Sequence, residues 1–197
     1  MKQTWNSGFD ERGRPIKLPN ISPTKEGTLI FPGQQGGTNW YNPSYSPRTG
    51  LFYIPTWADY YSRYTKFDVE YVPGRTYTGG APRSDVLGGS RDTRLIDTRV
   101  DGGYGAVRAL DPKTGEVKWE FKMDDVTDAG ILTTASDLLF TGNRDQYFYA
   151  LDARSGTMLW KIYLGGNVRS GPMSYQVGGK QYIAVAAGSG LFAFALK

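Results

Sequence analysis

The sequence contains the same phrase twice, as ALDPKTGEVKW at residues 109–119 and as ALDARSGTMLW at residues 150–160. Ala, Leu, Asp, Gly and Trp recur in register, with the two phrases starting at 109 and 150. In each phrase the Asp opens a tight turn whose carboxylate accepts backbone N–H groups, and the Gly supplies a corner with positive φ. Repetition at about 40 residues is typical of β-propeller blades. The phrase therefore predicts a unit of blade structure.

The residues around the second phrase divide into short strands separated by turn residues. Strands are expected at 129–135, 138–142, 146–151, 157–163, 170–177, 180–188 and 191–196. Gly178-Gly179 lies between two alternating runs and favours a two-residue hairpin turn, because both positions tolerate positive φ. Four short antiparallel strands in each period indicate an all-β fold made of propeller blades.

The first half repeats parts of this pattern. WNSGFDERGRP at 5–15 carries the Asp-x-x-Gly corner without the final Trp, and the segment 39–55 parallels the first hairpin of a blade. Strands of one inner type are expected at 5–9, 105–110, 146–151 and 191–196. This pattern predicts three blades and the tail of a fourth, in a single propeller segment that spans residues 1–197.

Trp119 and Trp160 end the two phrases, at or near the start of the expected outer strand of each blade. A large flat indole at that place can stack against the neighbouring blade. The small residues Ala109 and Ala150 leave room for such docking. Both tryptophans follow the repeat, so they are predicted to be structural docking residues.

Residues 57–103 interrupt the first full blade as a long insertion rich in Tyr, Gly, Arg and Asp. A loop of this length inside a compact domain is usually functional or disordered. Its aromatic residues suggest a lid over a pocket, and the alternative is surface packing with a mobile Gly-rich tail. The aromatic residues concerned are Trp57, Tyr60, Tyr61, Tyr64, Phe67 and Tyr71.

The composition excludes several classes of function. With no Cys and no His among 197 residues, the chain offers no zinc site of the usual kind, no Cys nucleophile and no Ser-His-Asp triad. The net charge of +4 comes from interleaved basic and acidic residues, so we expect no nucleic-acid binding. No apolar run approaches the roughly 18 residues that cross a bilayer. The N-terminal segment has no signal-peptide core, so any export signal is expected outside this chain.

The two phrases resemble the tryptophan-docking motifs of pyrroloquinoline-quinone (PQQ) dependent alcohol dehydrogenases, the methanol and ethanol dehydrogenase family of quinoproteins. GGTNWYNPSYSPRTGLFYIP is similar to that family's Gly-rich segment before a blade hairpin, and DAGILTTASDLLFTG and SGPMSYQVGGKQYIAVAAG are similar to its last two blades. The resemblance covers nearly all of the chain but only about the C-terminal third of the family. It implies a partial eight-bladed β-propeller with PQQ near the central axis.

The resemblance also implies a mechanism and a location. Ca²⁺ or a lanthanide polarises the quinone, an aspartate acts as base, and electrons pass from a small alcohol to a cytochrome-type acceptor in the periplasm. The family's metal ligands, catalytic Asp, adjacent-cysteine disulfide and quinone-stacking Trp belong to the part that is not matched. We therefore expect no catalytic residue and no metal ligand in this chain, which should be inactive when isolated.

The residues that match the family's PQQ contacts are few. Asn39 in GGTNW aligns with an Asn whose amide bonds the cofactor, and Trp40 beside it offers an apolar or N–H contact. Asp128 stands where family members carry a Trp, while Gly130 is retained. The backbone at Gly188 matches a segment that approaches the cofactor closely, where a missing Cβ helps.

Each of these assignments has a structural alternative. Asn39 alternatively caps a turn before Pro43, and Asp128 alternatively ends a turn in MDDVTDAG. A cation site at Asp124, Asp125 and Asp128 is disfavoured because no Gly-bearing ligand loop accompanies them. For the whole chain, the rival to an enzyme is a non-enzymatic propeller of PQQ-type repeats that acts as a protein-interaction scaffold.

Partners follow from the blade count. Three and a half blades leave unpaired strand edges, which invite association. The expected partner is therefore the remainder of a propeller, and self-association through open blade edges is expected when that remainder is absent.

Overall fold

The computed structural model describes residues 2–75, 77, 80–83 and 98–195. Contacts divide the chain into two compact units, one made of Met1–Gly37 with Ala58–Gly103 and the other of Thr38–Trp57 with Tyr104–Lys197. Every regular element among the described residues is a β-strand. The all-β prediction is confirmed, and no helix in the described ranges has the length and apolar character needed to cross a bilayer.

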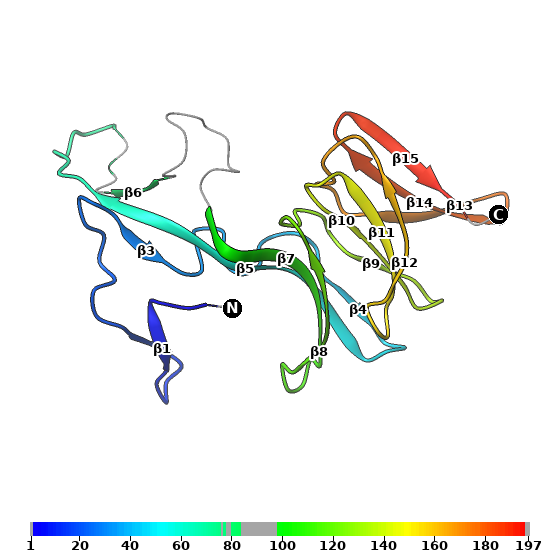
Figure 1. Cartoon of the computed structure of the whole chain (residues 1–197), viewed down its shortest axis with the longest axis horizontal. Coiled ribbons are helices and arrows are strands. Elements are labelled where there is room, and N and C mark those ends of the chain that lie inside the picture. Colours follow the sequence, from blue (N-terminus) through cyan, green and yellow to red (C-terminus); the bar gives the residue numbers. More distant parts are fainter. Residues whose placement is uncertain (1, 76, 78–79, 84–97, 196–197) are drawn as a thin grey trace. The chain divides into compact units, whose positions relative to one another are not determined.

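The second unit contains three successive sheets (Figure 1). The first sheet has the order β4 (Ser44–Ser46), β5 (Leu51–Lys66), β7 (Thr98–Leu110) and β8 (Val117–Met123). The second sheet has the order β9 (Leu132–Thr133), β10 (Leu138–Gly142), β11 (Tyr147–Asp152) and β12 (Met158–Tyr163). The third sheet has the order β13 (Met173–Val177), β14 (Lys180–Ala187) and β15 (Gly190–Phe194). The first two sheets have the four-stranded form of propeller blades. Of the strands predicted as one inner type, β7, β11 and β15 each come third in the chain order of their sheets, and the one expected at 5–9 belongs to the first unit.

The turns of the repeated phrase have the predicted geometry. The Asp152 carboxylate accepts the backbone N–H of Arg154 at 2.8 Å, and Gly156 has a φ of 74°. In the first phrase the corresponding carboxylate of Asp111 accepts an N–H at 2.8 Å, and Gly115 has a φ of 73°. The two copies of the phrase therefore fold into the same turn.

Two apolar cores lie between neighbouring sheets of the second unit. The first core joins the first and second sheets and consists of Tyr53, Val107, Ala109, Met123, Ile131, Leu139, Tyr149, Leu151 and Ala153. The second core joins the second and third sheets and consists of Ala129, Phe140, Phe148, Ala150, Val168, Ile183, Val185 and Ala187. Sheets packed face to face in succession are what the blade interpretation requires.

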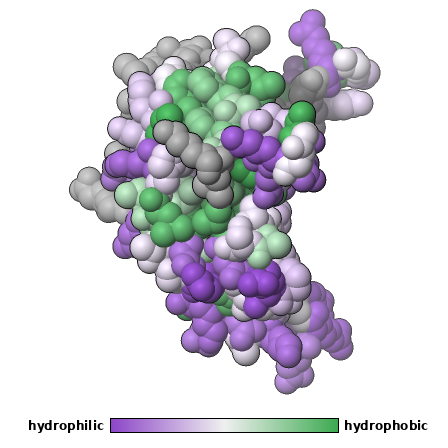
Figure 2. Space-filling view, turned by 90° about the vertical axis from the view of Figure 1, so that its right-hand side faces the viewer, coloured by the Kyte–Doolittle hydropathy of each residue, from purple (hydrophilic) through white to green (hydrophobic). Residues whose placement is uncertain are grey.

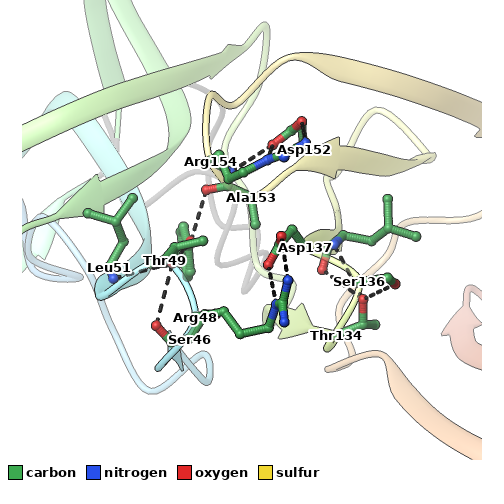
Figure 3. A network of polar contacts seen from close by, with 12 residues as sticks. Ser46, Arg48, Thr49, Leu51, Thr134, Ser136, Asp137, Asp152, Ala153 and Arg154 are labelled. Atoms are coloured by element: carbon green, nitrogen blue, oxygen red, sulfur yellow. Dashed lines mark hydrogen bonds and ion pairs between the residues drawn. The ribbon is translucent and has the colours of Figure 1, made fainter.

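Trp119 docks the first sheet onto the second. Its indole N–H donates to the carbonyl of Ala153 at 3.1 Å, and the Tyr53 hydroxyl donates to the same carbonyl at 2.9 Å. The ring lies against Gly156, where an added Cβ would meet the Trp119 Cε3 atom at 2.5 Å. Figure 3 shows two ion pairs in this region, Arg48 with Asp137 and Arg154 with Asp152. The predicted structural role of Trp119 is thus explained by named contacts.

Trp160 occupies the same place in the second sheet but stays 39% exposed. Its ring meets Phe148 and Phe194 edge-on, with centroids 6.4 and 5.3 Å away. Other exposed apolar side chains on β12 to β15 are Met158, Leu159, Tyr163, Met173, Val177 and Leu191. Figure 2, which faces this side, shows a broad area of apolar surface.

The first unit contains β1 (Asn6–Phe9) paired with β2 (Pro15–Lys17), and β3 (Thr28–Ile30) and β6 (Gly80–Arg83) paired with the second half of β5. The predicted insertion therefore differs from a loop at both ends, because residues 57–66 continue β5 and residues 98–103 belong to β7. Positions 76, 78–79 and 84–97 of the insertion lie outside the described residues. The lid stays a prediction.

Candidate functional site

The candidate site is built from the segments that precede the first strand of each sheet in the second unit. These segments are 38–43 before β4, 124–131 before β9 and 164–172 before β13. The Ile131 N–H donates to the carbonyl of Asn42 at 2.9 Å, and the Gly130 N–H donates to that of Ser170 at 3.4 Å. These backbone bonds hold the three segments together at one end of the sheets.

Asp128 is the buried acid of this assembly, with only 4% of the residue exposed. Arg144, in the turn between β10 and β11, pairs with both carboxylate oxygens, at 2.6 Å through Nε and 3.1 Å through Nη2. A second guanidinium, that of Arg169, approaches Asp128 at 3.6 Å through Nε. A buried carboxylate is costly unless it is paired, and here the bidentate partner offsets the lost hydration.

Tyr41 also lies next to the Asp128 carboxylate. Burial raises the pKa of the Tyr41 phenol well above its usual value, and the Asp128 charge and its hydrogen bond with the phenol raise it further. The phenol therefore stays protonated and serves as a hydrogen-bond donor to Asp128.

Trp57 forms the apolar support of this cluster. Its indole N–H donates to the carbonyl of Thr127 at 2.9 Å, while the Tyr41 ring stacks on it at 6.3 Å. The Arg144 guanidinium lies over the same indole, 5.2 Å from its centroid. Cation–π stacking and the ion pair together fix the orientation of Arg144.

Gly130 is a position of close contact. An added Cβ would meet the Asn42 side-chain oxygen at 1.8 Å, and the same oxygen lies 2.4 Å from an added Cβ at Gly171. The Asn42 amide donates to the carbonyl of Ile131 at 3.1 Å. The two glycines thus make room for one amide that joins the three segments, which is a structural reason for Gly130.

Asn39 and Trp40 lie beside the cluster on its solvent side. The Asn39 side-chain oxygen accepts the backbone N–H of the adjacent Trp40 at 2.8 Å, and the contact of Asn39 with a cofactor stays a prediction. Trp40 is 77% exposed, and its ring rests on Tyr41 with centroids 4.7 Å apart. A flat indole is therefore available to a ligand at this place.

Gly188, in the turn between β14 and β15, has a φ of 55° and donates its N–H to the carbonyl of Asn167 at 3.1 Å. An added Cβ at Gly166 would meet the Gly188 backbone nitrogen at 2.6 Å. Gly188 therefore packs against the segment that also carries Arg169. The structure records no direct contact of Gly188 with Asp128 or Trp40 among the described residues.

The charges of the cluster favour an anion and disfavour a metal ion. Two guanidiniums face one carboxylate, which leaves a net charge of about +1. Within the ranges that the structure describes, no group of three or more acidic side chains is placed to hold a cation. The charge of this cluster therefore matches an acidic ligand and does not match Ca²⁺ or a lanthanide.

Comparison with known proteins gives this geometry a context. Residues 122–183 match the family model described as the β-propeller domain of glucose, ethanol and alcohol dehydrogenases that use PQQ. The chain is 37% identical over 198 residues to a quinoprotein alcohol dehydrogenase of Pseudomonas putida, and 40% identical over 199 residues to a 1-butanol dehydrogenase (quinone) of Thauera butanivorans. Each match covers 95% of this chain.

Solved structures agree. The quinohemoprotein alcohol dehydrogenase of Comamonas testosteroni superposes with a TM-score of 0.76 at 25% identity, covering 97% of this chain and 28% of that one. A europium-containing methanol dehydrogenase gives 0.76 at 28% identity, covering 94% and 31%.

The chain is similar to a segment of the quinoprotein alcohol dehydrogenases. The predicted resemblance and the partial propeller are thereby confirmed. The chain spans about 29% of the length of the quinoprotein relatives it matches.

Sequence reasoning named some residues of this cluster and missed others. The structure brings Trp40, Asp128 and Gly130 into one assembly and places Asn39 and Gly188 at its margins. Sequence reasoning did not identify Arg144, Arg169 or Tyr41. The signal available for them was Asp128 itself, because it directly precedes the run AGIL and a carboxylate buried with such a run needs a partner.

Proposed function

We propose that the chain forms part of a PQQ-dependent quinoprotein alcohol dehydrogenase and supplies one wall of the cofactor pocket. The observation that carries this proposal is the joining of three blade-leading segments by backbone hydrogen bonds around an exposed indole and a net positive cluster. The similarity of nearly the whole chain to quinoprotein alcohol dehydrogenases supports it.

The chain's own residues have defined tasks in this proposal. Trp40 offers a flat face on which a planar ring can stack. The Asn39 amide offers hydrogen-bond donors to carbonyl and carboxylate oxygens of the cofactor. Asp128 does not contact the cofactor in this proposal; it fixes the two guanidiniums.

PQQ, when bound, supplies the quinone that accepts a hydride from the alcohol carbon. The metal ion and its ligands, Ca²⁺ or a lanthanide, would come from outside these residues, as would the catalytic base. The acceptor is proposed to be a cytochrome, and the compartment the periplasm. Two relatives, a 1-butanol dehydrogenase and a lupanine 17-hydroxylase, carry cytochrome c in their names, which supports the acceptor.

The test is a titration of PQQ into the full chain, in which binding is measured by the quenching of tryptophan fluorescence. Asn39→Ala is expected to weaken binding by about two- to tenfold, the range for one hydrogen bond. Trp40→Ala is expected to weaken it too, while Trp160→Ala, which removes another partly exposed indole, should leave affinity unchanged. The chain alone is expected to oxidise no alcohol. Equal affinity in all three variants contradicts the proposed pocket wall.

A further inference from the structure

We propose that Arg169 is the receptor for a carboxylate carried by the alcohol substrate. The substrate class is then alcohols that bear a carboxylate group. Carboxylate binding by Arg169 stands on the geometry alone, whereas its assignment to the substrate rests on the proposed dehydrogenase function.

The first argument is the difference between the two arginines. Arg144 is satisfied, because it holds both oxygens of Asp128, stacks on Trp57 and has a side chain only 11% exposed. Arg169 has a side chain 49% exposed and reaches Asp128 only at 3.6 Å. Across the described ranges, this approach is the one polar contact recorded for the Arg169 side chain.

The second argument is the arrangement of charge. Arg144 already neutralises the carboxylate, so the charge of Arg169 has no closely bonded counterpart. Guanidinium donors form paired hydrogen bonds with the two oxygens of a carboxylate, a geometry that a point charge does not provide. Asp128 nevertheless attracts Arg169 and limits its motion, so less side-chain entropy is lost when a ligand binds.

The third argument is the surface beside Arg169. Tyr41 bonds to the carboxylate that Arg169 approaches, and the same Tyr41 ring supports the exposed indole of Trp40. An exposed aromatic ring and an exposed guanidinium therefore both lie near one buried residue, Tyr41. A carboxylate held by Arg169 would therefore lie next to a ring stacked on Trp40, as the alcohol substrate must lie next to the quinone in the proposed pocket.

The test uses calorimetric titration of the full chain with 4-(hydroxymethyl)benzoate, and with its neutral isostere 4-(hydroxymethyl)benzamide. The benzoate is expected to bind about 10- to 100-fold more tightly, the range for hydrogen bonds to a charged group. Arg169→Gln should abolish this preference, and Arg169→Lys should restore only part of it. Arg154→Gln removes an exposed arginine elsewhere and should change nothing. Circular dichroism confirms that each variant is folded.

Three outcomes overturn the proposal. One is equal affinity for the two probes, and another is a benzoate preference that survives in Arg169→Gln. The third is loss of the preference when PQQ is present at saturation, which would assign Arg169 to a carboxylate of the cofactor. PQQ binding without any benzoate preference would refute this inference and leave the proposed function intact. A benzoate preference without PQQ binding would refute the proposed function and leave the anion site.

Discussion

Trp119 and Trp160 end two copies of one phrase, yet their surroundings differ. Trp119 rests on Gly156 and donates to Ala153, both in the turn of the next copy. Trp160 makes edge-to-face contacts with Phe148 and Phe194 and remains 39% exposed. The phrase is therefore a connector with two ends. The Asp-to-Gly turn of the second copy packs against the Trp of the first copy. The Trp of the second copy lies where it would pack against the turn of a following copy.

The largest expected effect comes from truncating the docked ring. Trp119→Ala should lower the free energy of unfolding of the second unit by about 3 kcal/mol or more, because it empties a packed site and removes the donor to Ala153. Trp160→Ala should cost about 1–2 kcal/mol, since that ring is already part-exposed. Urea unfolding followed by circular dichroism measures both. Equal losses of unfolding free energy in the two variants would mean that docking of the ring onto the turn does not stabilise the unit.

A smaller effect is expected from the two turn glycines, which form a matched pair. Gly115 and Gly156 have φ values of 73° and 74°, but only Gly156 has a ring against it. Gly115→Ala should cost about 1 kcal/mol for the left-handed backbone alone. Gly156→Ala should cost about 3 kcal/mol, because the new Cβ also displaces Trp119. In a Trp119→Ala background the two glycine substitutions should become equal. A persisting difference would contradict the contact.

The smallest effect concerns the turn carboxylate. The Arg154 guanidinium and the backbone N–H groups lower the pKa of Asp152 to about 2. The folded-state pKa lies below the unfolded value, so this contribution to stability is present above about pH 4 and is lost as the pH falls towards 2.

The stability difference between the wild type and Asp152→Asn should therefore shrink over that pH window. Urea midpoints at pH 5, 3 and 2 measure it. The shrinkage should be weaker in an Arg154→Gln background, and identical shrinkage in both backgrounds would contradict the ion pair.

The fold of the second unit could be predicted because its signals are local. Hairpin glycines, the Asp-to-Gly turn and alternating strands each act over a few residues, and β10 appears at the predicted residues 138–142. The continuation of β5 to Lys66 was missed although its signal was present. Residues 57–66 contain no Gly or Pro and are rich in Trp, Tyr and Thr, which favours a strand.

The site was predicted less fully, because its contacts join distant residues. Asp128 pairs with Arg144 across 16 residues, and Asn42 bonds to Ile131 across 89. The periodic pattern of apolar and polar residues in the sequence does not indicate which distant residues form such pairs. The resemblance led to Asp128 as a replaced tryptophan, but only the packing of three segments shows that this acid organises two arginines.

The carbonyl of Ala153 has a consequence for how the unit opens. Both of its acceptor positions are occupied from the neighbouring sheet, by the phenol of Tyr53 and the indole of Trp119. The first two sheets cannot separate without breaking both bonds and exposing their shared core. We therefore expect these two sheets to open together. The three-stranded sheet β13–β15 packs on the second sheet through the second core, and we expect its amide hydrogens to exchange through a separate opening.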